Sequence, residues 1–474
     1  MESRTKIVCT MGPAVNHPQK IDQLIEAGMN VARINFSHGT HEEHRETINN
    51  LKQARERAKI PLAIMLDTKG PEIRLGKLKE EQITLKEGQT LWLVREEIEG
   101  NEREITLKPS IVFESLKKDM FVLLDDGYII THVVAVENKG VKVEVDHGGV
   151  IRSTRGVNVP TAEIALPAMT EQDVEDIRFG CKEGIDLIAA SFIRSADHII
   201  SIKKLLKEEK SSGIGIIAKI ENHQGVQNFD DIAKVADGIM IARGDLGVEL
   251  PLSRVPHLQK KMIRACYLAA KPSVTATQML ESMIIKSRPT RAEVSDVANA
   301  IYDSTSAVML SGETAIGSYP VETVKIMKEI AEEAEKDFNN YEFFKTNFEQ
   351  LLPDTPTAVT KASIKTAYGV NAKAIFAFTA SGLTARLLAR MRPEMPIIAM
   401  TPNPRVYHQL AIVWGVIPIL RKDVNNIEDA KKKISEYALS RQIVAYGDPV
   451  VITAGTPFGK AGTTNMMIVD TITV

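Results

Sequence analysis

Short apolar runs alternate along the chain with longer segments whose apolar residues recur every three or four positions. The short runs are rich in β-branched residues, which favours strands, whereas the longer segments have the period of amphipathic helices. Strands are predicted in the first two thirds of the chain at residues 6–11, 31–36, 62–67, 187–192, 214–220, 238–242, 273–277 and 307–310. The helices predicted between them include residues 40–58, 170–183, 196–209, 293–302 and 320–338.

This alternation of strand and helix predicts a parallel sheet, because parallel strands are usually joined by helical crossovers. Eight repeats fit a closed (β/α)8 TIM barrel, in which functional residues gather at the carboxyl ends of the strands. The expected fold class is therefore α/β, and we assign residues 1–69 and 168–345 to a catalytic barrel.

The pattern changes to a period of two after residue 69. Residues 89–94 and 141–145 alternate apolar and polar side chains, and residues 137–140 form a turn signal between strands. We predict an inserted all-β domain over residues 70–167. Because it leaves from the carboxyl end of a barrel strand, it can cover the site as a lid that moves about the Gly70 and Pro167 regions.

A proline-containing segment at residues 351–356 indicates another domain boundary. Strands and helices alternate again after it, which predicts a C-terminal α/β domain over residues 351–474. Its strands are expected at residues 374–378, 397–401, 416–420, 450–454 and 466–469.

Charged residues stand at the ends of two predicted strands. Lys219 and Glu221 end one strand, and Arg243 and Asp245 follow the next. Side chains two residues apart on a strand point to the same side, so two carboxylates and a lysine converge if these strands are neighbours. Isolated charges in apolar surroundings cost several kcal/mol unless they are paired or bind a metal. The sequence therefore predicts a metal ion and an anion at these strand ends.

The composition is that of an ordinary globular protein: 474 residues, 25% charged, 44% hydrophobic, with a net charge of -2. This charge gives no reason to expect nucleic acid or a membrane as a partner. Cys9, Cys181 and Cys266 are far apart and odd in number, which is typical of a reducing compartment. No apolar run reaches the roughly 20 residues of a membrane span, and strand-like sequence from Thr5 argues against a targeting peptide. We expect a cytoplasmic protein.

Five motifs along the chain resemble those of the pyruvate kinase family. In order, they are residues 65–74 (MLDTKGPEIR), 219–222 (KIEN), 242–247 (ARGDLG), 276–282 (ATQMLES) and 311–315 (SGETA). The resemblance covers the whole chain and implies transfer of the phosphoryl group of phosphoenolpyruvate to ADP, giving pyruvate and ATP in the last step of glycolysis. It also implies a cytoplasmic, allosterically regulated homotetramer that needs Mg²⁺ (or Mn²⁺) and K⁺, with a C-terminal domain for effector binding and oligomerisation.

The resemblance gives the residues at the two charged strand ends distinct roles. Glu221 and Asp245 are expected to bind Mg²⁺, since carboxylate oxygens suit a hard cation. Lys219 is expected to stabilise the transferred phosphoryl group and the enolate left behind, and the backbone at Gly244 to approach the substrate carboxylate. The alternative is a structural Lys219 that only neutralises the two acids. Arg243 is assigned no catalytic role.

Thr277 resembles the threonine near the carbon that is protonated when enolpyruvate becomes pyruvate. A hydroxyl is too weak an acid to act alone, so a relay through water or a carboxylate is expected, with Ser311 and Glu313 as the nearest candidates by resemblance. A second reading stays equally open, in which Thr277 only binds the substrate carboxylate. The proton donor is not identified.

A monovalent cation site is implied at the second and third predicted strands. Arg33, Asn35 and Ser37 share one face by parity, and Arg33 is expected to bind the phosphate of the substrate. The K⁺ ligands implied by the resemblance are Asn35, Ser37, Asp67 and Thr68. Glu72 agrees with this, because family members that do without K⁺ tend to carry lysine there.

The resemblance places the nucleotide against Asn35, His38, Arg74 and Arg155. His38, His41 and His44 follow each other every three residues, which spreads the rings around a helix instead of converging on a metal. We therefore expect a solvated helix start, with Thr40 and Glu43 forming a capping box.

An effector site is expected in the C-terminal domain, where a predicted strand leads into a helix. A helix start suits an anion, and the residues resembling the effector pocket of regulated relatives are Thr379, Ser381, Gly382 and Thr384, together with the loop at residues 455–464. The expected ligand is a phosphorylated metabolite.

Two other functions are compatible with parts of the pattern. Another Mg²⁺-dependent phosphoenolpyruvate or oxaloacetate barrel enzyme would share Glu221 and Asp245 but would need no lid for a nucleotide. A catalytically idle paralogue could sense metabolites, although intact Lys219 and Thr277 argue against it. Turnover that depends on ADP distinguishes these functions.

Overall fold

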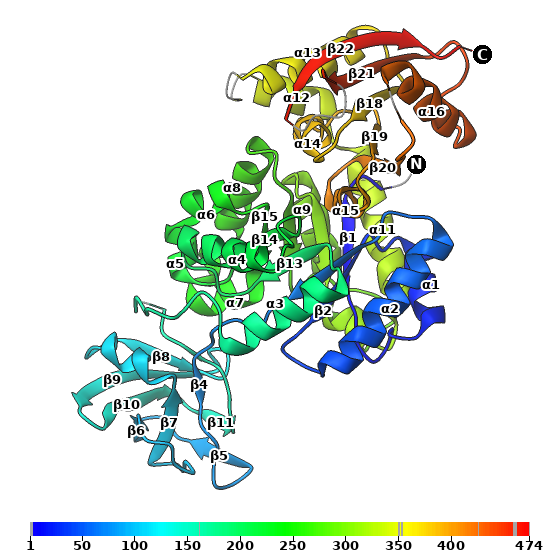
Figure 1. The fold of residues 1–474 in the computed structure, drawn as a ribbon. Helices are drawn as coiled ribbons and strands as arrows, with labels where there is room; N and C mark the ends of the chain where they lie inside the picture. Colours follow the sequence, from blue (N-terminus) through cyan, green and yellow to red (C-terminus); the bar gives the residue numbers. More distant parts are fainter. Residues whose placement is uncertain are drawn as a thin grey trace.

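The computed structural model describes residues 3–160, 162–348, 351, 354–424, 426–457 and 462–473. Its centre is a closed barrel of eight parallel strands in the order β1-β17-β16-β15-β14-β13-β3-β2, which confirms the predicted fold class (Figure 1). The strands are β1 (Lys6–Thr10), β2 (Val31–Asn35), β3 (Ala63–Asp67), β13 (Leu187–Ala190), β14 (Gly215–Ile220), β15 (Gly238–Ala242), β16 (Ser273–Ala276) and β17 (Ala307–Leu310).

Helices surround this barrel and connect successive strands. They are α1 (Pro18–Ala27), α2 (His41–Ala58), α3 (Glu171–Glu183), α4 (Ala196–Glu208), α5 (His223–Gln227), α6 (Phe229–Val235), α7 (Arg243–Glu249), α8 (Val255–Leu268), α9 (Arg291–Tyr302), α10 (Gly312–Ala315) and α11 (Pro320–Lys336), with 3-10 turns η2 (Leu252–Arg254) and η3 (Glu281–Ile284). Several strands end earlier than predicted; β13, for example, stops at Ala190 instead of residue 192. The polar residues that follow lie in the loops of the barrel rim, not in the sheet.

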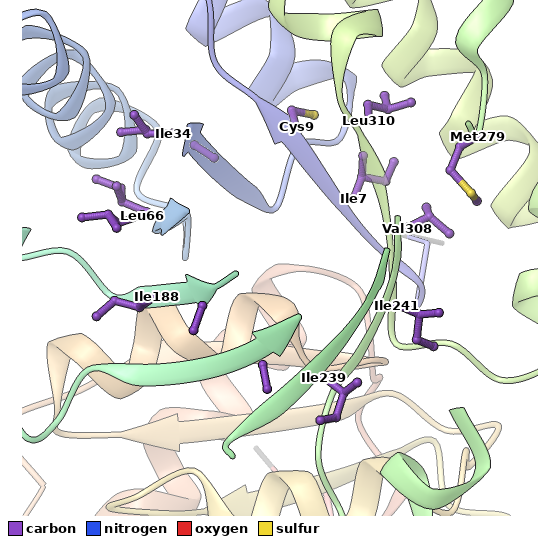
Figure 2. Packing of buried hydrophobic residues seen from close by; sticks show 14 of the residues in the cluster. Ile7, Cys9, Ile34, Leu66, Ile188, Ile239, Ile241, Met279, Val308 and Leu310 are labelled. Carbon is purple, nitrogen blue, oxygen red and sulfur yellow. The ribbon is translucent and has the colours of Figure 1, made fainter. Parts of the chain in front are cut away.

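Alternate strand residues belong to two different apolar clusters, as the period of two requires. Ile7 of β1 and Ile239 of β15 pack with the surrounding helices (Figure 2). Their neighbours Val8 and Met240 belong to the barrel interior. This interior cluster continues into residues of the C-terminal domain such as Leu388, so apolar burial joins the two parts.

The segment between β3 and α3 forms a separate β-sheet structure with its own apolar core. A seven-stranded sheet has the order β12-β8-β9-β10-β6-β7-β4, and β11 pairs with β5. The strands are β4 (Arg74–Leu75), β5 (Gln82–Leu85), β6 (Thr90–Val94), β7 (Glu104–Lys108), β8 (Phe121–Leu124), β9 (Ile129–Glu137), β10 (Gly140–His147), β11 (Gly149–Arg152) and β12 (Val157–Asn158), with a 3-10 turn η1 (Ser110–Glu114). The turn predicted between residues 137 and 140 is present, and only glycine fits at Gly140, where φ is 151° and a Cβ would lie 2.0 Å from the Leu93 carbonyl oxygen.

The C-terminal part is a five-stranded sheet with the order β20-β19-β18-β21-β22, in which only β22 is antiparallel to its neighbour. Figure 1 shows it and the inserted sheet at different ends of the barrel. Its elements are α13 (Thr355–Gly369), β18 (Ala374–Phe378), α14 (Leu383–Ala389), β19 (Ile397–Thr401), α15 (Pro404–Gln409), η4 (Leu410–Ile412), β20 (Val416–Leu420), α16 (Ile427–Ser440), β21 (Pro449–Gly455) and β22 (Thr464–Thr471), preceded by α12 (Asn340–Phe348). Among all these described helices, none has the length and apolar character needed to cross a membrane.

Candidate active site

Lys219 lies buried near the end of β14, with three side-chain oxygens around its ammonium group. Nζ is 3.1 Å from Asp67 Oδ1, 3.0 Å from Glu221 Oε1 and 2.7 Å from Ser191 Oγ. Burial alone would lower the pKa of Lys219, but the charges of Asp67 and Glu221 outweigh it and hold the pKa above its usual range. Lys219 is therefore a fixed cation held in one position.

Asp67, at the end of β3, links this lysine to an arginine on the neighbouring strand. Arg33 Nε donates to Asp67 Oδ2 over 2.5 Å, and Arg33 Nη1 donates to Thr10 Oγ1 over 2.9 Å. Burial would raise the pKa of Asp67, but Arg33 and Lys219 outweigh this and keep the pKa below its usual range. Two cations and one carboxylate thus form a continuous charged row across the barrel mouth.

Ser191 completes this arrangement and was not predicted from the sequence. Its hydroxyl accepts from Lys219, lies 3.1 Å from Asp67 Oδ1 and donates to the Thr68 carbonyl over 2.6 Å. The side chain is buried, at 3% exposure. A serine directly after the apolar run of β13 was the available signal, but placing residues 187–192 in one strand concealed it.

Glu221 and Asp245 meet at the rim and leave negative charge uncompensated. Glu221 Oε2 accepts the backbone N–H of Phe192 over 2.7 Å, whereas no lysine or arginine of the described ranges forms an ion pair with Asp245. Burial, followed by the charge of Glu221, raises the pKa of Asp245 to about 7. Two adjacent carboxylates, one of them without a cationic partner, are a donor set that a hard divalent cation fits.

The described residues contain no group of three or more histidine, cysteine or acidic side chains able to hold a metal. A Mg²⁺ ion at Glu221 and Asp245 would therefore take its other ligands from substrate and water, which is its usual behaviour at phosphoryl sites.

Arg243 does not share a strand face with Asp245, so that expectation was wrong. Helix α7 begins at Arg243 immediately after β15, and helical geometry turns the two side chains apart. Arg243 instead pairs with Asp296 at 2.7 Å, and its Nη2 donates to the Thr277 carbonyl over 2.7 Å.

Gly244 lies in the first turn of α7 and is not among the glycines with positive φ. Its N–H donates to Thr277 Oγ1 over 2.8 Å, and a Cβ at this position would lie 3.4 Å from the same oxygen. Close approach of the backbone, rather than an unusual φ, is what glycine provides here.

Thr277 follows β16 in a backbone conformation that L-residues rarely adopt, with φ of 69°. Its hydroxyl donates to the Ala276 carbonyl over 2.6 Å, and φ at Gln278 is 55°. Such residues cost about 1–3 kcal/mol each and cluster at functional sites. The contact from Arg243 to the Thr277 carbonyl helps to maintain this conformation.

Ser311 and Glu313 lie at the end of β17. The Glu313 carboxylate accepts the backbone N–H groups of Ser311, over 2.7 Å, and Leu280, over 3.2 Å, and burial raises its pKa. Within the described ranges no hydrogen bond joins Thr277 to Ser311 or Glu313. The structure therefore brings Glu313 to the backbone of the rim and not to the Thr277 hydroxyl.

The residues expected to bind K⁺ lie on neighbouring elements. Asn35 is in register with Asp67, and Thr68 is buried directly after it. Parity along the strand had placed Ser37 on the same face as Asn35. Because β2 ends at Asn35, Ser37 lies in the following turn instead. The Asn35 side-chain oxygen accepts the Ser37 N–H over 3.2 Å, which keeps the two residues together.

The residues expected to meet the nucleotide are divided between the barrel and the inserted sheet. His38 is exposed after β2, whereas Arg74 lies in β4 of the inserted sheet and Arg155 in the connection between β11 and β12. Arg74 pairs with Glu72, and Arg155 lies 3.2 Å from Asp125. Both arginines thus have protein partners that a phosphate would have to replace or share.

Two of the three histidines after β2 contradict the expected solvated helix start. The capping box at Thr40 is present, but the His44 ring is buried and stacks on Phe36 with a centroid distance of 4.0 Å. His41 Nε2 lies 2.6 Å from Asp176 Oδ1. His41 packs against α3, which the helical period cannot reveal, and the His44 ring packs back onto the turn after β2.

The expected effector residues surround the start of α14. Gly382 has φ of 79° and begins the turn into the helix. Thr379 and Thr384 are buried, and the Thr384 hydroxyl is 2.7 Å from that of Thr464. The Ser381 carbonyl accepts from Arg386 over 3.3 Å. Residues 458–461 of the expected effector loop lie outside the described residues.

The chain matches two family models of pyruvate kinase. The model of the barrel domain matches residues 2–324, and that of the alpha/beta domain matches residues 357–469. A pyruvate kinase of Chlamydia trachomatis serovar D is 49% identical over 456 residues, covering 95% of this chain and 94% of the relative. One from Geobacillus stearothermophilus is 46% identical over 474 residues, covering 100% and 81%. A crystal structure of a pyruvate kinase from Cryptosporidium parvum has a TM-score of 0.95 and 37% identity, covering 99% of this chain and 96% of that one.

Proposed function

The chain belongs to the pyruvate kinase family, whose members transfer the phosphoryl group of phosphoenolpyruvate to ADP, and we propose that this reaction takes place around Lys219 at the carboxyl end of the barrel. The observation that supports this location is the buried Lys219, fixed between Asp67 and Glu221, beside the unpaired carboxylate of Asp245. Positive and negative groups at one rim suit a substrate that carries a phosphate and a metal ion.

Lys219 and Arg33 are the two cations proposed to face the phosphoryl group. Phosphoryl transfer depends mainly on positioning and charge stabilisation, with little covalent chemistry by the protein. Lys219 can stabilise negative charge on the transferred group and on the enolate oxygen, because its neighbours hold it protonated and in place. Arg33, anchored by Asp67, orients the phosphate from the adjacent strand.

Glu221 and Asp245 would hold Mg²⁺, for which Mn²⁺ can substitute, and Asn35, Ser37, Asp67 and Thr68 would hold K⁺. When bound, these ions supply positive charge that neutralises phosphoryl and enolate oxygens. The raised pKa of Asp245 supports the divalent site, since a cation there relieves the repulsion between the two carboxylates.

The start of α7 is proposed to bind the substrate carboxylate. The absence of a side chain at Gly244 lets a ligand approach its backbone, and the Thr277 hydroxyl lies beside that backbone. In this position Thr277 either binds the carboxylate or participates in delivering a proton to the enolpyruvate carbon, with Ser311 and Glu313 contributing through the adjacent rim.

The nucleotide is proposed to bind between the barrel and the inserted sheet, which would act as a lid. Asn35 and His38 would contact it from the barrel, and Arg74 and Arg155 from the lid. One contact already spans this gap, since Asn158 Nδ2 donates to Glu249 Oε1 over 2.8 Å.

The family relationship supports two further proposals, one about regulation by an effector and one about assembly into an oligomer. A phosphorylated metabolite would bind at the turn formed by Thr379, Ser381, Gly382 and Thr384, and the chain would act as a homotetramer. Mass measurement in solution tests the assembly, and a shift in the half-saturating phosphoenolpyruvate concentration that is lost in Ser381→Ala tests the effector turn.

Omission experiments test the reaction itself. Pyruvate formation from phosphoenolpyruvate is measured with the complete mixture and with ADP, Mg²⁺ or K⁺ left out in turn, tetramethylammonium replacing K⁺ at constant ionic strength. We expect turnover only with ADP and the divalent ion, and a large loss without K⁺. Pyruvate formation independent of ADP would reject kinase activity, and full activity without K⁺ would reject the monovalent site alone.

A further inference from the structure

Three arginines gather at the amino-terminal end of the barrel, opposite the candidate active site. Arg386 belongs to α14, and Arg390 and Arg392 follow it in the C-terminal part. They face residues before the barrel strands: Arg390 lies 3.3 Å from the Leu268 carbonyl, and Arg392 donates to the Ser304 carbonyl. The side chains of Arg390 and Arg392 are only 8% and 2% exposed.

Neutral oxygens are the hydrogen-bond acceptors found for these three guanidinium groups. Besides the two carbonyls above, Arg390 Nη2 donates to Thr357 Oγ1 over 2.8 Å and Arg386 Nη1 to the Ser381 carbonyl over 3.3 Å. In the ranges described, no carboxylate forms an ion pair with any of them. The Nε atoms of Arg390 and Arg392 are buried without an acceptor.

Such a cluster is unfavourable without a counter-charge. Burial lowers the pKa of Arg392 to about 9 and that of Arg390 to about 10, with the distant acids Glu335 and Asp354 offsetting it only in part. Arginine nonetheless remains protonated in proteins, so the buried charges stay. The Arg392 guanidinium lies 4.5 Å from the centroid of the Trp414 ring. This cation–π contact partly stabilises the charge of Arg392, one of the three arginines.

A narrow hollow, partly open to solvent, lies between these groups. Its lining includes Arg386, Arg390, Arg392, Lys271, Ser306 and Trp414. Lys271 is engaged by the carbonyls of Ala233, Lys234 and Ala236, so the three arginines supply the donors that are available. A second narrow hollow shares Arg392 and Trp414.

We propose that this basic hollow is a binding site for a small phosphate-type oxyanion at the junction of the barrel and the C-terminal domain. Guanidinium forks suit the oxygens of a phosphate, and the Nε donors of Arg390 and Arg392 have no acceptor from the protein. The hollow is separate from the rim where substrate binds. It contacts the proposed effector turn only through the bond from Arg386 to Ser381.

A tryptophan built into the hollow can report binding directly. The chain contains two tryptophans, and replacing the other one, Trp92→Phe in the lid, leaves Trp414 as the single reporter. Inorganic phosphate is titrated into this full-length variant at constant ionic strength, with chloride as the balancing anion. We expect a saturable change in Trp414 fluorescence, weakened about tenfold or more by Arg386→Gln, which removes one charged hydrogen-bond donor.

Arg441→Gln is the matched control, because Arg441 is exposed at the end of α16 and outside the hollow. It should leave the phosphate response unchanged. Titration with glycerol phosphate identifies the source of the ligand chemistry: tighter binding than phosphate indicates a phosphomonoester, and weaker binding indicates free phosphate. No saturable response to either anion, an equal response to chloride, or a response that survives Arg386→Gln would overturn the proposal.

Thermal unfolding separates binding from a structural role of Arg386. Without phosphate, Arg386→Gln should unfold at the same or a higher temperature than the parent, since it relieves repulsion among buried cations. It should also lose the part of phosphate stabilisation that Arg441→Gln retains. A lower unfolding temperature without phosphate, together with undiminished phosphate stabilisation, would show that Arg386 is structural and contradict the site.

Discussion

The two ends of the barrel bury charge in opposite ways. At the carboxyl end, Arg33 and Lys219 are matched by Asp67 and Glu221, and the charge left over is the negative charge of Asp245. At the amino end, three arginines are buried against carbonyl and hydroxyl oxygens. The first end therefore requires a cation and the second an anion.

The two ends also differ in how the chain builds them. Residues at the carboxyl end sit at the ends of consecutive strands, so short motifs encode them. The amino end is assembled from loops of the barrel and from α14, whose residues lie about a hundred positions away in sequence. Local patterns can predict the first kind of site and not the second.

The largest effect is expected when the central cation of the carboxyl end is removed. Lys219→Met should reduce kcat by about 10³-fold, because it deletes preorganised positive charge and leaves Asp67 and Glu221 facing each other. Steady-state pyruvate formation measures this. Lys234→Met, which removes an exposed lysine of α6, should retain full turnover. Comparable rates for both variants would mean that Lys219 only neutralises the acids.

A smaller loss of kcat is expected from Ser191→Ala, which tests whether Ser191 positions Lys219 at the same end of the barrel. Removing its bond to Lys219 should lower kcat about tenfold, with a smaller change in KM, because one charge-assisted hydrogen bond orients the ammonium group. Ser201→Ala on the exposed face of α4 serves as the control. If only KM or only stability changes, Ser191 does not position the lysine for catalysis.

The stability of the amino end should depend on pH through His408 of α15. Burial lowers the pKa of His408 from 6.5 to about 3. As the pH falls below 6.5, the unfolded chain takes up a proton that the folded chain refuses, so stability falls by up to about 1.4 kcal/mol per pH unit until roughly pH 3. His408→Gln should reduce the slope of unfolding free energy against pH between 6 and 4, measured with urea.

His132→Gln, which alters a histidine paired with Asp146 in the inserted sheet, controls for general effects of losing a histidine. A slope that His408→Gln leaves unaltered would place the acid sensitivity elsewhere in the molecule.

The sequence could predict those parts of the protein that depend on local patterns. The barrel was predictable because strand and helix periods alternate regularly, and Lys219 and Glu221 because they are two residues apart at a strand end. Arg243 and Asp245 were misplaced, since the sequence pattern does not reveal that a helix begins directly after β15. Ser191 and His41 depend on neighbours more than a hundred residues away, which no local period encodes.

Divalent-cation binding is the most direct test, because Glu221 and the unpaired Asp245 are the carboxylates proposed to hold the metal ion. Mn²⁺ binding in the presence of phosphoenolpyruvate can be followed by electron paramagnetic resonance for the parent, Glu221→Gln, Asp245→Asn and the exposed control Asp230→Asn. We expect each of the first two substitutions to weaken Mn²⁺ binding about tenfold or more and the control to bind as the parent does. Unchanged Mn²⁺ affinity in both Glu221→Gln and Asp245→Asn would contradict it.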